Sequence, residues 1–188
     1  KIISKKEFEN QTGFTFSKNN FLVSFHPETL LPDFGISIFE NLLIILEKFD
    51  CNILFTSPNA DVGSKEIHNL IKKFIFKNKD KCFYYPSLGQ KLYHNALILF
   101  DCLIGNSSSG IIEAPLLKRK VLNLGDRQKG RFRFGEVIDV QNNLASMSQS
   151  LINILKYKSE DFNYKEFLNS YNSSTPTDEI IKFLKFKI

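Results

Sequence analysis

The chain has 188 residues, of which 43% are hydrophobic and 24% charged, which excludes a disordered protein and suits one well-buried globular domain. Its apolar runs are far too short to span a membrane and no signal peptide is visible, so we expect a cytoplasmic protein with no membrane partner. The net charge of +5 comes from lysines scattered along helices and loops without an RNA-binding motif, so we also expect no nucleic-acid partner.

Short apolar runs alternate with helix-spaced apolar residues along the chain, after a polar lead-in segment, residues 1–19, in which Ser4 caps a short helix. Towards the C-terminus, residues 164–171 are weakly helical and residues 178–188 form a last helix. The predicted strands span residues 21–25, 51–56, 82–85, 102–104, 121–124 and 136–140, and the predicted helices span residues 33–49, 64–76, 91–98 and 143–157.

Strands that alternate with single helices are typical of βαβ units. Because parallel crossovers are right-handed, few topologies remain. We therefore predict an α/β fold: a Rossmann-like parallel sheet with helices on both faces. We assign residues 20–158 to this domain and residues 159–188 to C-terminal helices outside it.

Polar side chains follow five of the predicted strands at the point where each strand ends. Ligands of doubly wound sheets bind outside the carboxyl ends of the strands, so these side chains predict a site at that edge. They are His26 after the first strand, Asn59 and Asp61 after the second, Ser87 after the third, Ser107 to Ser109 after the fourth and Arg127 after the fifth.

The three cysteines, Cys51, Cys82 and Cys102, lie in or beside predicted strands. Buried free thiols in a reducing compartment fit these positions better than disulfides do. No metal-ligand spacing appears in the sequence, and we expect neither a metal nor a cofactor.

Residues 101–131 carry the strongest pattern in the chain: a strand, a serine-rich turn, a short helix with Glu113, a second strand and a basic loop. Free N–H groups at a helix start, serine hydroxyls and the arginine side chains of the loop are suited to an anion. Glu113 lies four residues after Ser109, about one turn into the predicted helix, where a carboxylate can receive two ribose hydroxyls. The pattern predicts a cradle for a nucleoside diphosphate. The alternative is an ordinary serine-capped turn with a solvated basic loop.

Single residues of the predicted edge leave alternatives open. The His26 ring is expected to face the crevice, where it could donate to a phosphate or exchange a proton, or it caps backbone groups instead. Asn59 and Asp61 fit turn chemistry equally well. His68 and His94 fall inside predicted helices and are read as structural or solvated.

The loop at Ser87 to Gly89 offers backbone groups to a base, and Tyr93 one turn later is interpreted as core packing more readily than as a ligand contact. No serine-hydrolase elbow and no glycosidase pair of carboxylates is present. A complete catalytic set is therefore not evident in this chain.

Five sequence blocks follow one another along the chain: Ser-Phe-His-Pro-Glu-Thr at residues 24–29, Pro-Asn-Ala-Asp at 58–61, Pro-Ser-Leu-Gly at 86–89, Gly-Asn-Ser-Ser-Ser-Gly-x-x-Glu at 105–113 and Gly-Asp-Arg-Gln-Lys-Gly-Arg at 125–131. In this order they resemble the C-terminal half of the hydrolysing UDP-N-acetylglucosamine 2-epimerase family, the bacterial kind that feeds sialic and related nonulosonic acid synthesis.

The resemblance implies one half of a two-domain enzyme of GT-B type, with residues 20–158 as the UDP-binding domain. Position by position, it implies that Ser107, Ser108 and Ser109 bind the diphosphate together with Arg127, and that Glu113 binds the ribose. The loop from Tyr85 through Ser87 to Gly89 would contact the uracil, and Asn59 would contact the substrate. His26 would lie beside the diphosphate and also take part in catalysis.

The implied reaction is anti elimination of UDP from UDP-N-acetylglucosamine, followed by hydration with inversion at C2 to N-acetylmannosamine, without a metal or cofactor. A relative that acts on UDP-diacetylbacillosamine has a similar cradle, so the sugar stays open. The family's N-terminal half is missing from the sequence, so we expect a C-terminal fragment, natural or cloned, that binds UDP weakly and is inactive alone.

By the same resemblance, residues 178–188 would be the helix that crosses to the missing N-terminal domain. The oligomeric state stays open, with a homodimer as one alternative. Two other functions also stay open. One is the nucleotide-sugar-binding half of a GT-B glycosyltransferase, and the other is a non-enzymatic module that binds nucleotide sugars.

Overall fold

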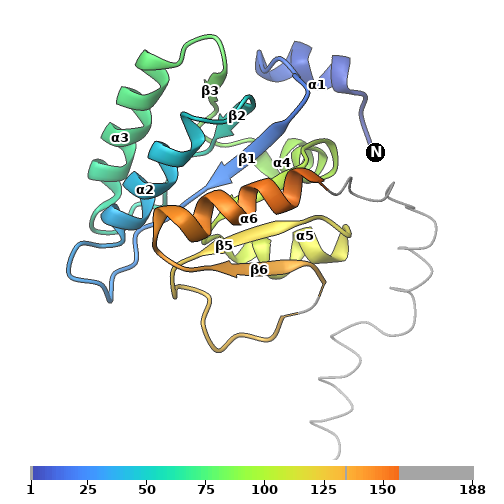
Figure 1. The fold of residues 1–188 in the computed structure, drawn as a ribbon. Coiled ribbons are helices and arrows are strands. Elements are labelled where there is room, and N and C mark those ends of the chain that lie inside the picture. Colours follow the sequence, from blue (N-terminus) through green and yellow to red (C-terminus); the bar gives the residue numbers. More distant parts are fainter. Residues whose placement is uncertain (1, 134, 157–188) are drawn as a thin grey trace, which may run out of the picture.

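A six-stranded parallel sheet in the order β3-β2-β1-β4-β5-β6 forms the centre of the computed structural model, which describes residues 2–133 and 135–156 (Figure 1). The strands are β1 (Asn20–Ser24), β2 (Asn52–Phe55), β3 (Cys82–Tyr84), β4 (Cys102–Gly105), β5 (Val121–Leu124) and β6 (Val137–Val140). The helices are α1 (Lys5–Thr12), α2 (Ile36–Leu46), α3 (Ser64–Lys77), α4 (Gly89–Leu99), α5 (Glu113–Leu116) and α6 (Leu144–Lys156), with one 3-10 turn, η1 (Ser108–Gly110).

Helices cover both faces of the sheet, as the alternating sequence pattern predicts (Figure 1). Helices α2, α3 and α6 pack on one face and share a core cluster with strand residues such as Phe21 and Val23. Helices α1, α4 and α5 share a second cluster on the other face, to which Leu22 of the same strand belongs. All five residues of β1 are buried, because this central strand is covered on both sides. The predicted Rossmann-like fold is confirmed.

The strand order places a topological switch point between β1 and β4. The chain winds outward from β1 through β2 to β3, then returns to the other side of β1 and continues through β4, β5 and β6. The loops after β1 and β4 therefore diverge from one another and leave a crevice at the carboxyl edge of the sheet, where doubly wound folds bind ligands.

The lead-in segment is packed onto the sheet domain. The Ser4 side chain accepts a hydrogen bond from the Glu7 N–H at 3.1 Å, which confirms the predicted cap, and α1 ends at Gly13 in the left-handed conformation. Edge-on and tilted aromatic contacts then hold this segment against α4 and β3. The rings involved are those of Phe8, Phe14, Phe16, Phe83 and Phe100.

Two helices begin two or more residues away from their predicted starts. Helix α2 begins at Ile36 rather than near residue 33, because Phe34 and Gly35 have positive φ angles of 55° and 77° and the Asp33 carboxylate accepts the N–H groups of Gly35 and Ser37. Helix α4 begins at Gly89, two residues before its predicted start. The helices expected at 164–171 and 178–188 lie outside the described residues.

The cysteines and the lengths of the helices bear on two further predictions, buried free thiols and no membrane-spanning segment. Cys51, Cys82 and Cys102 are buried and free, and burial raises the pKa of the Cys51 thiol to about 11. Free buried thiols are thus confirmed. Between residues 2 and 156, leaving out 134, no helix is long and apolar enough to cross a membrane.

We predict that Gly105→Ala destabilises the fold strongly. Gly105 ends β4 at a φ of 141°, and a Cβ there would lie 2.0 Å from the Ser24 carbonyl oxygen of β1. The substitution should lower the free energy of unfolding by about 2–4 kcal/mol. Gly13→Ala is the control, since Gly13 has a φ of 72° with open space around it and should lose only roughly 1 kcal/mol. Equal losses in urea unfolding would contradict the steric account.

Candidate functional site

A hollow of about 360 Å³ opens at the carboxyl edge of the sheet. It is bordered by the ends of β1 and β2, the loop between β3 and α4, helix α4 and the turn after β4. The structure thus brings loops from four strands together at the switch point. Seven of the predicted site residues line this hollow: His26, Ser87, Gly89, Ser107, Ser108, Ser109 and Glu113.

His26 is held as a neutral hydrogen-bond donor at the start of this hollow. Its ring Nδ1 accepts the backbone N–H of Asn59 at 3.0 Å, so at neutral pH the remaining proton sits on Nε2. Burial and, next, the positive charge of Arg127 lower the pKa of His26 from 6.5 to about 4, while Asp61 acts in the opposite direction. The imidazole can therefore donate to an anion at neutral pH without carrying a charge of its own.

Asn106 ties the loop after β1 to the turn after β4. Its side-chain Oδ1 accepts the His26 N–H at 2.7 Å, and its Nδ2 donates to the His26 carbonyl oxygen at 2.8 Å. The same Nδ2 lies 3.4 Å from Oε1 of buried Glu28. Asn106 itself has no exposed surface. This amide fixes His26 at a set distance from the serine-rich turn.

The turn after β4 differs from its prediction. We expected one helix in which Glu113 sits a turn after Ser109, whereas the chain forms the short turn η1, breaks at residues 111 and 112, and starts α5 at Glu113. Pro115 explains the break, since proline lacks an N–H and in a continuous helix its ring would clash with the carbonyl group four positions earlier. The groups that this turn can offer to an anion are accordingly hydroxyl and backbone donors rather than the end of a long helix.

The three serines of the turn have different environments. Ser109 is 5% exposed and donates through Oγ to Ser107 Oγ at 3.0 Å. Ser107 and Ser108 are partly exposed and line the hollow. Ser107 and Ser108 are thus available to a ligand, whereas Ser109 supports the shape of the turn.

Helix α4 contributes two side chains to the hollow, Tyr93 and His94, that the sequence did not predict as site residues. Tyr93 packs in the apolar cluster as expected, yet its hydroxyl lies 2.5 Å from Ser109 Oγ and lines the hollow; burial raises its pKa. His94, which we had interpreted as structural or solvated, lies with Nε2 2.9 Å from Glu113 Oε1. Gln90, Tyr93 and His94 share one helix face by their i, i+3, i+4 spacing, and this spacing is the sequence signal that could have identified them as site residues.

The basic loop after β5 approaches the turn from the other side. Arg127 Nη1 and Gln128 Nε2 both donate to the Asn106 carbonyl oxygen, at 3.3 and 2.8 Å. The Glu28 carboxylate accepts the Asp126 N–H at 3.1 Å and so anchors the loop. Arg127 does not line the hollow, but its charge acts on His26 beside it.

Two predicted site residues lie elsewhere. Asn59 is exposed and reaches the site through its backbone N–H to His26, not through its side chain. Tyr85 packs its ring against the cluster under α4 and is not among the residues that line the hollow, whereas its neighbours Pro86 and Ser87 are.

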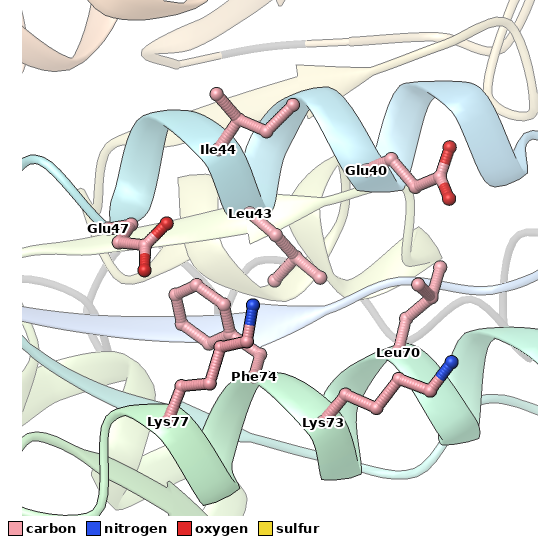
Figure 2. Close-up of a pocket in the computed structure, with 8 residues that line it drawn as sticks. All are labelled: Glu40, Leu43, Ile44, Glu47, Leu70, Lys73, Phe74 and Lys77. Carbon is pink, nitrogen blue, oxygen red and sulfur yellow. The ribbon is translucent and has the colours of Figure 1, made fainter.

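A second hollow of about 450 Å³ lies between helices α2 and α3, away from the carboxyl edge (Figure 2). Glu40 of α2 and Glu47, the residue that follows α2, face Lys73 and Lys77 of α3 across an apolar floor that includes Leu43 and Phe74. The described residues that line this groove come from α2, its C-cap and α3, so the groove differs from the edge of the sheet, where polar loops converge.

Comparison with known proteins gives matches along most of the chain. The sequence profile of the UDP-N-acetylglucosamine 2-epimerase family matches residues 2–185. The chain is 32% identical over 146 residues to a GDP/UDP-N,N'-diacetylbacillosamine 2-epimerase (hydrolyzing) of Campylobacter jejuni, a match that covers 76% of this chain and 37% of the relative. It is 41% identical over 140 residues to polysialic acid biosynthesis protein P7 of Escherichia coli, covering 73% of this chain and 35% of that protein.

The chain therefore spans little more than a third of these curated relatives. Among solved structures, the UDP-GlcNAc 2-epimerase of Neisseria meningitidis bound to UDP-GlcNAc superposes with a TM-score of 0.57 at 15% identity. That match covers 98% of this chain and 48% of the solved one. At this identity the likeness concerns the fold.

We predict that stability falls as the pH drops from 6.5 towards 4, in part through His26. The lowered pKa of the folded state means that the unfolded chain binds a proton in this range that the folded chain excludes, so the contribution is complete above pH 6.5 and is lost below it. His26→Asn keeps a short acceptor for the Asn59 N–H and does not titrate. Urea unfolding between pH 7 and 4 should show a shallower decline for this variant, and equal slopes would contradict the neutral-histidine account.

Proposed function

The chain belongs to the UDP-N-acetylglucosamine 2-epimerase family, and from that premise we propose that it is the part of a hydrolysing 2-epimerase that binds the UDP of the nucleotide sugar. The observation that carries the proposal is the convergence of a neutral His26, two accessible serines and Glu113 on one hollow, with Arg127 beside His26. Residues 20–158 form the UDP-binding domain in this proposal.

The diphosphate would lie between the serine-rich turn and the loop after β1. Ser107 and Ser108 offer hydroxyl donors there, and His26 offers its Nε2–H. Arg127 supplies the positive charge, and hydrogen bonds from a charged donor to phosphate are among the stronger ones in proteins. Because His26 is uncharged, the favourable charge at this end of the hollow rests mainly on Arg127.

The uridine would extend from the diphosphate towards α4. Glu113 would accept the ribose hydroxyls, since an ionised carboxylate only accepts hydrogen bonds. The loop from residue 85 to residue 89 would meet the uracil through its backbone, because the Tyr85 ring packs against the apolar cluster and does not line the hollow. Asn59 would act through His26 in this arrangement, as its backbone N–H fixes the imidazole.

The reaction we propose for the complete enzyme is elimination followed by hydration. The C1–O bond to UDP breaks as the C2 proton leaves, which gives a 2-acetamidoglucal and UDP; water then adds with inversion at C2 to release N-acetylmannosamine. Negative charge develops on the departing diphosphate, and preorganised donors such as Arg127 and the Nε2–H of His26 stabilise it. Glu113 is the carboxylate that lines the described hollow, and it is engaged by the ribose, so we propose that the chain alone does not turn over substrate.

A second sugar is favoured by one observation. The 32% identical Campylobacter relative is described as a hydrolysing epimerase of diacetylbacillosamine, so UDP-diacetylbacillosamine is the alternative substrate. Incubation of the complete enzyme with each UDP-sugar in water, followed by mass spectrometry of the free sugar, distinguishes the two. Absence of any free sugar without an added acceptor would favour a glycosyltransferase or a binding module instead.

The proposal extends to the compartment of the cell in which the protein acts. We propose a cytoplasmic location, and the support for it is that the buried, free thiols suit a reducing compartment, where disulfides do not form.

We predict that calorimetric titrations with UDP and with uridine distinguish the residues that bind the diphosphate from those that bind the ribose. Arg127→Ala should weaken UDP about tenfold or more and leave uridine unchanged, because it removes a charged hydrogen bond to phosphate only. Glu113→Ala should weaken both ligands. Lys129→Ala is the control, since this neighbouring lysine is exposed and pairs with Asp126 at 2.9 Å. UDP binding that is equally insensitive to all three substitutions would contradict the proposed site.

A further inference from the structure

The His94 side chain of helix α4 contacts the carboxylate of Glu113, which lines the hollow. Nε2 of His94 lies 2.9 Å from Oε1 of Glu113, and both side chains are part-exposed, at 38% and 40%. An ionised carboxylate cannot donate, so the histidine must carry its proton on Nε2 and donate it. The two residues are 19 positions apart and come from different elements, so the contact depends on the tertiary fold.

Glu113 has little else to fix its orientation. It is the first residue of the four-residue helix α5, directly after the break at residues 111 and 112. Within residues 2–133 and 135–156, the hydrogen bonds of its side chain are confined to the one from His94. A glutamate side chain has several rotatable bonds, and ordering it costs conformational entropy. His94 offsets that cost before a ligand arrives.

The contact leaves the carboxylate able to receive a ribose. Oε1 has a second lone pair beside the one that His94 uses, and Oε2 retains both of its own. A pair of vicinal hydroxyls can therefore donate to the two oxygens while the histidine stays bound. Tyr93, the adjacent residue of α4, is linked to Ser109 at 2.5 Å, so one turn of this helix orders both the serine-rich turn and the carboxylate.

We propose that His94 is a positioning residue that holds Glu113 in the orientation for ribose, and thereby makes the hollow select ribonucleoside over 2′-deoxyribonucleoside diphosphates. The inference rests on the proposed function, because it needs UDP in the hollow. It assigns a role to a residue that acts through Glu113 and does not itself contact the reacting atoms.

The test is calorimetric titration of the chain with UDP and with 2′-deoxy-UDP. The wild-type chain should prefer UDP by about tenfold or more, the value of one hydrogen bond to a charged group. His94→Ala should reduce that preference towards unity. His94→Gln should restore most of it, since the Gln side-chain amide can donate from nearly the same place as Nε2.

Two controls separate a positioning role from a general structural one. His68→Ala removes a histidine of α3 that lies near Tyr84 and outside the hollow, and it should leave the preference unchanged. In a Glu113→Ala background, His94→Ala should have no further effect on either ligand, because the two residues act as a unit. The thermal unfolding midpoint of each variant shows whether it is folded.

The titrations distinguish failure of the positioning role from failure of the proposed function. A preference that survives in folded His94→Ala, or a His94→Ala effect of equal size without Glu113, overturns the positioning role and leaves the proposed function standing. A wild-type chain that binds neither ligand at millimolar concentration overturns the proposed function for this chain, and the positioning role with it. Lost preference in His94→Ala with recovery in His94→Gln supports the inference.

Discussion

The buried amide of Asn106 is the interaction on which the rest of the site depends. Beyond the last paired residues of β1 and β4, its side chain exchanges two hydrogen bonds with the backbone of His26, much as another step of the sheet would. Its own carbonyl oxygen receives Arg127 and Gln128. One fully buried residue thereby joins the loops after β1, β4 and β5, and it can approach so closely because Gly105 precedes it with no side chain against β1.

This clamp also explains the distribution of charge at the edge of the sheet. It brings Arg127 close enough to His26 to lower the imidazole pKa together with burial, so the two cation-forming groups do not both carry charge. The serine-rich turn follows Asn106 directly in the chain, and Glu113 lines the hollow where it contacts His94 of α4. The hollow therefore has a positive end near Arg127 and a negative end at Glu113. This charge distribution suits a ligand with an anionic diphosphate and a neutral, hydroxyl-rich ribose.

Local patterns were enough to predict the parallel sheet, the Ser4 cap and the buried thiols, because each depends on apolar spacing or on a capping residue. The break before Glu113 could have been predicted from Pro115, because a proline cannot continue the hydrogen bonding of a helix that starts at the serine-rich turn. The Asn106 clamp and the His94–Glu113 contact could not be predicted, since their partners lie 80 and 19 positions apart and meet only once the elements are packed.

The measurement that tests the central claim most directly is amide chemical-shift mapping of the isotopically labelled chain during titration with UDP. The account predicts saturable shifts centred on His26, Ser107 to Glu113 and the loop from residue 85 to residue 90, with Arg127 among them. The groove between α2 and α3 should stay unchanged. Shifts confined to that groove, around Glu40 to Glu47 and Leu70 to Lys77, or no saturable shifts at millimolar UDP, would contradict a nucleotide site at the carboxyl edge of the sheet.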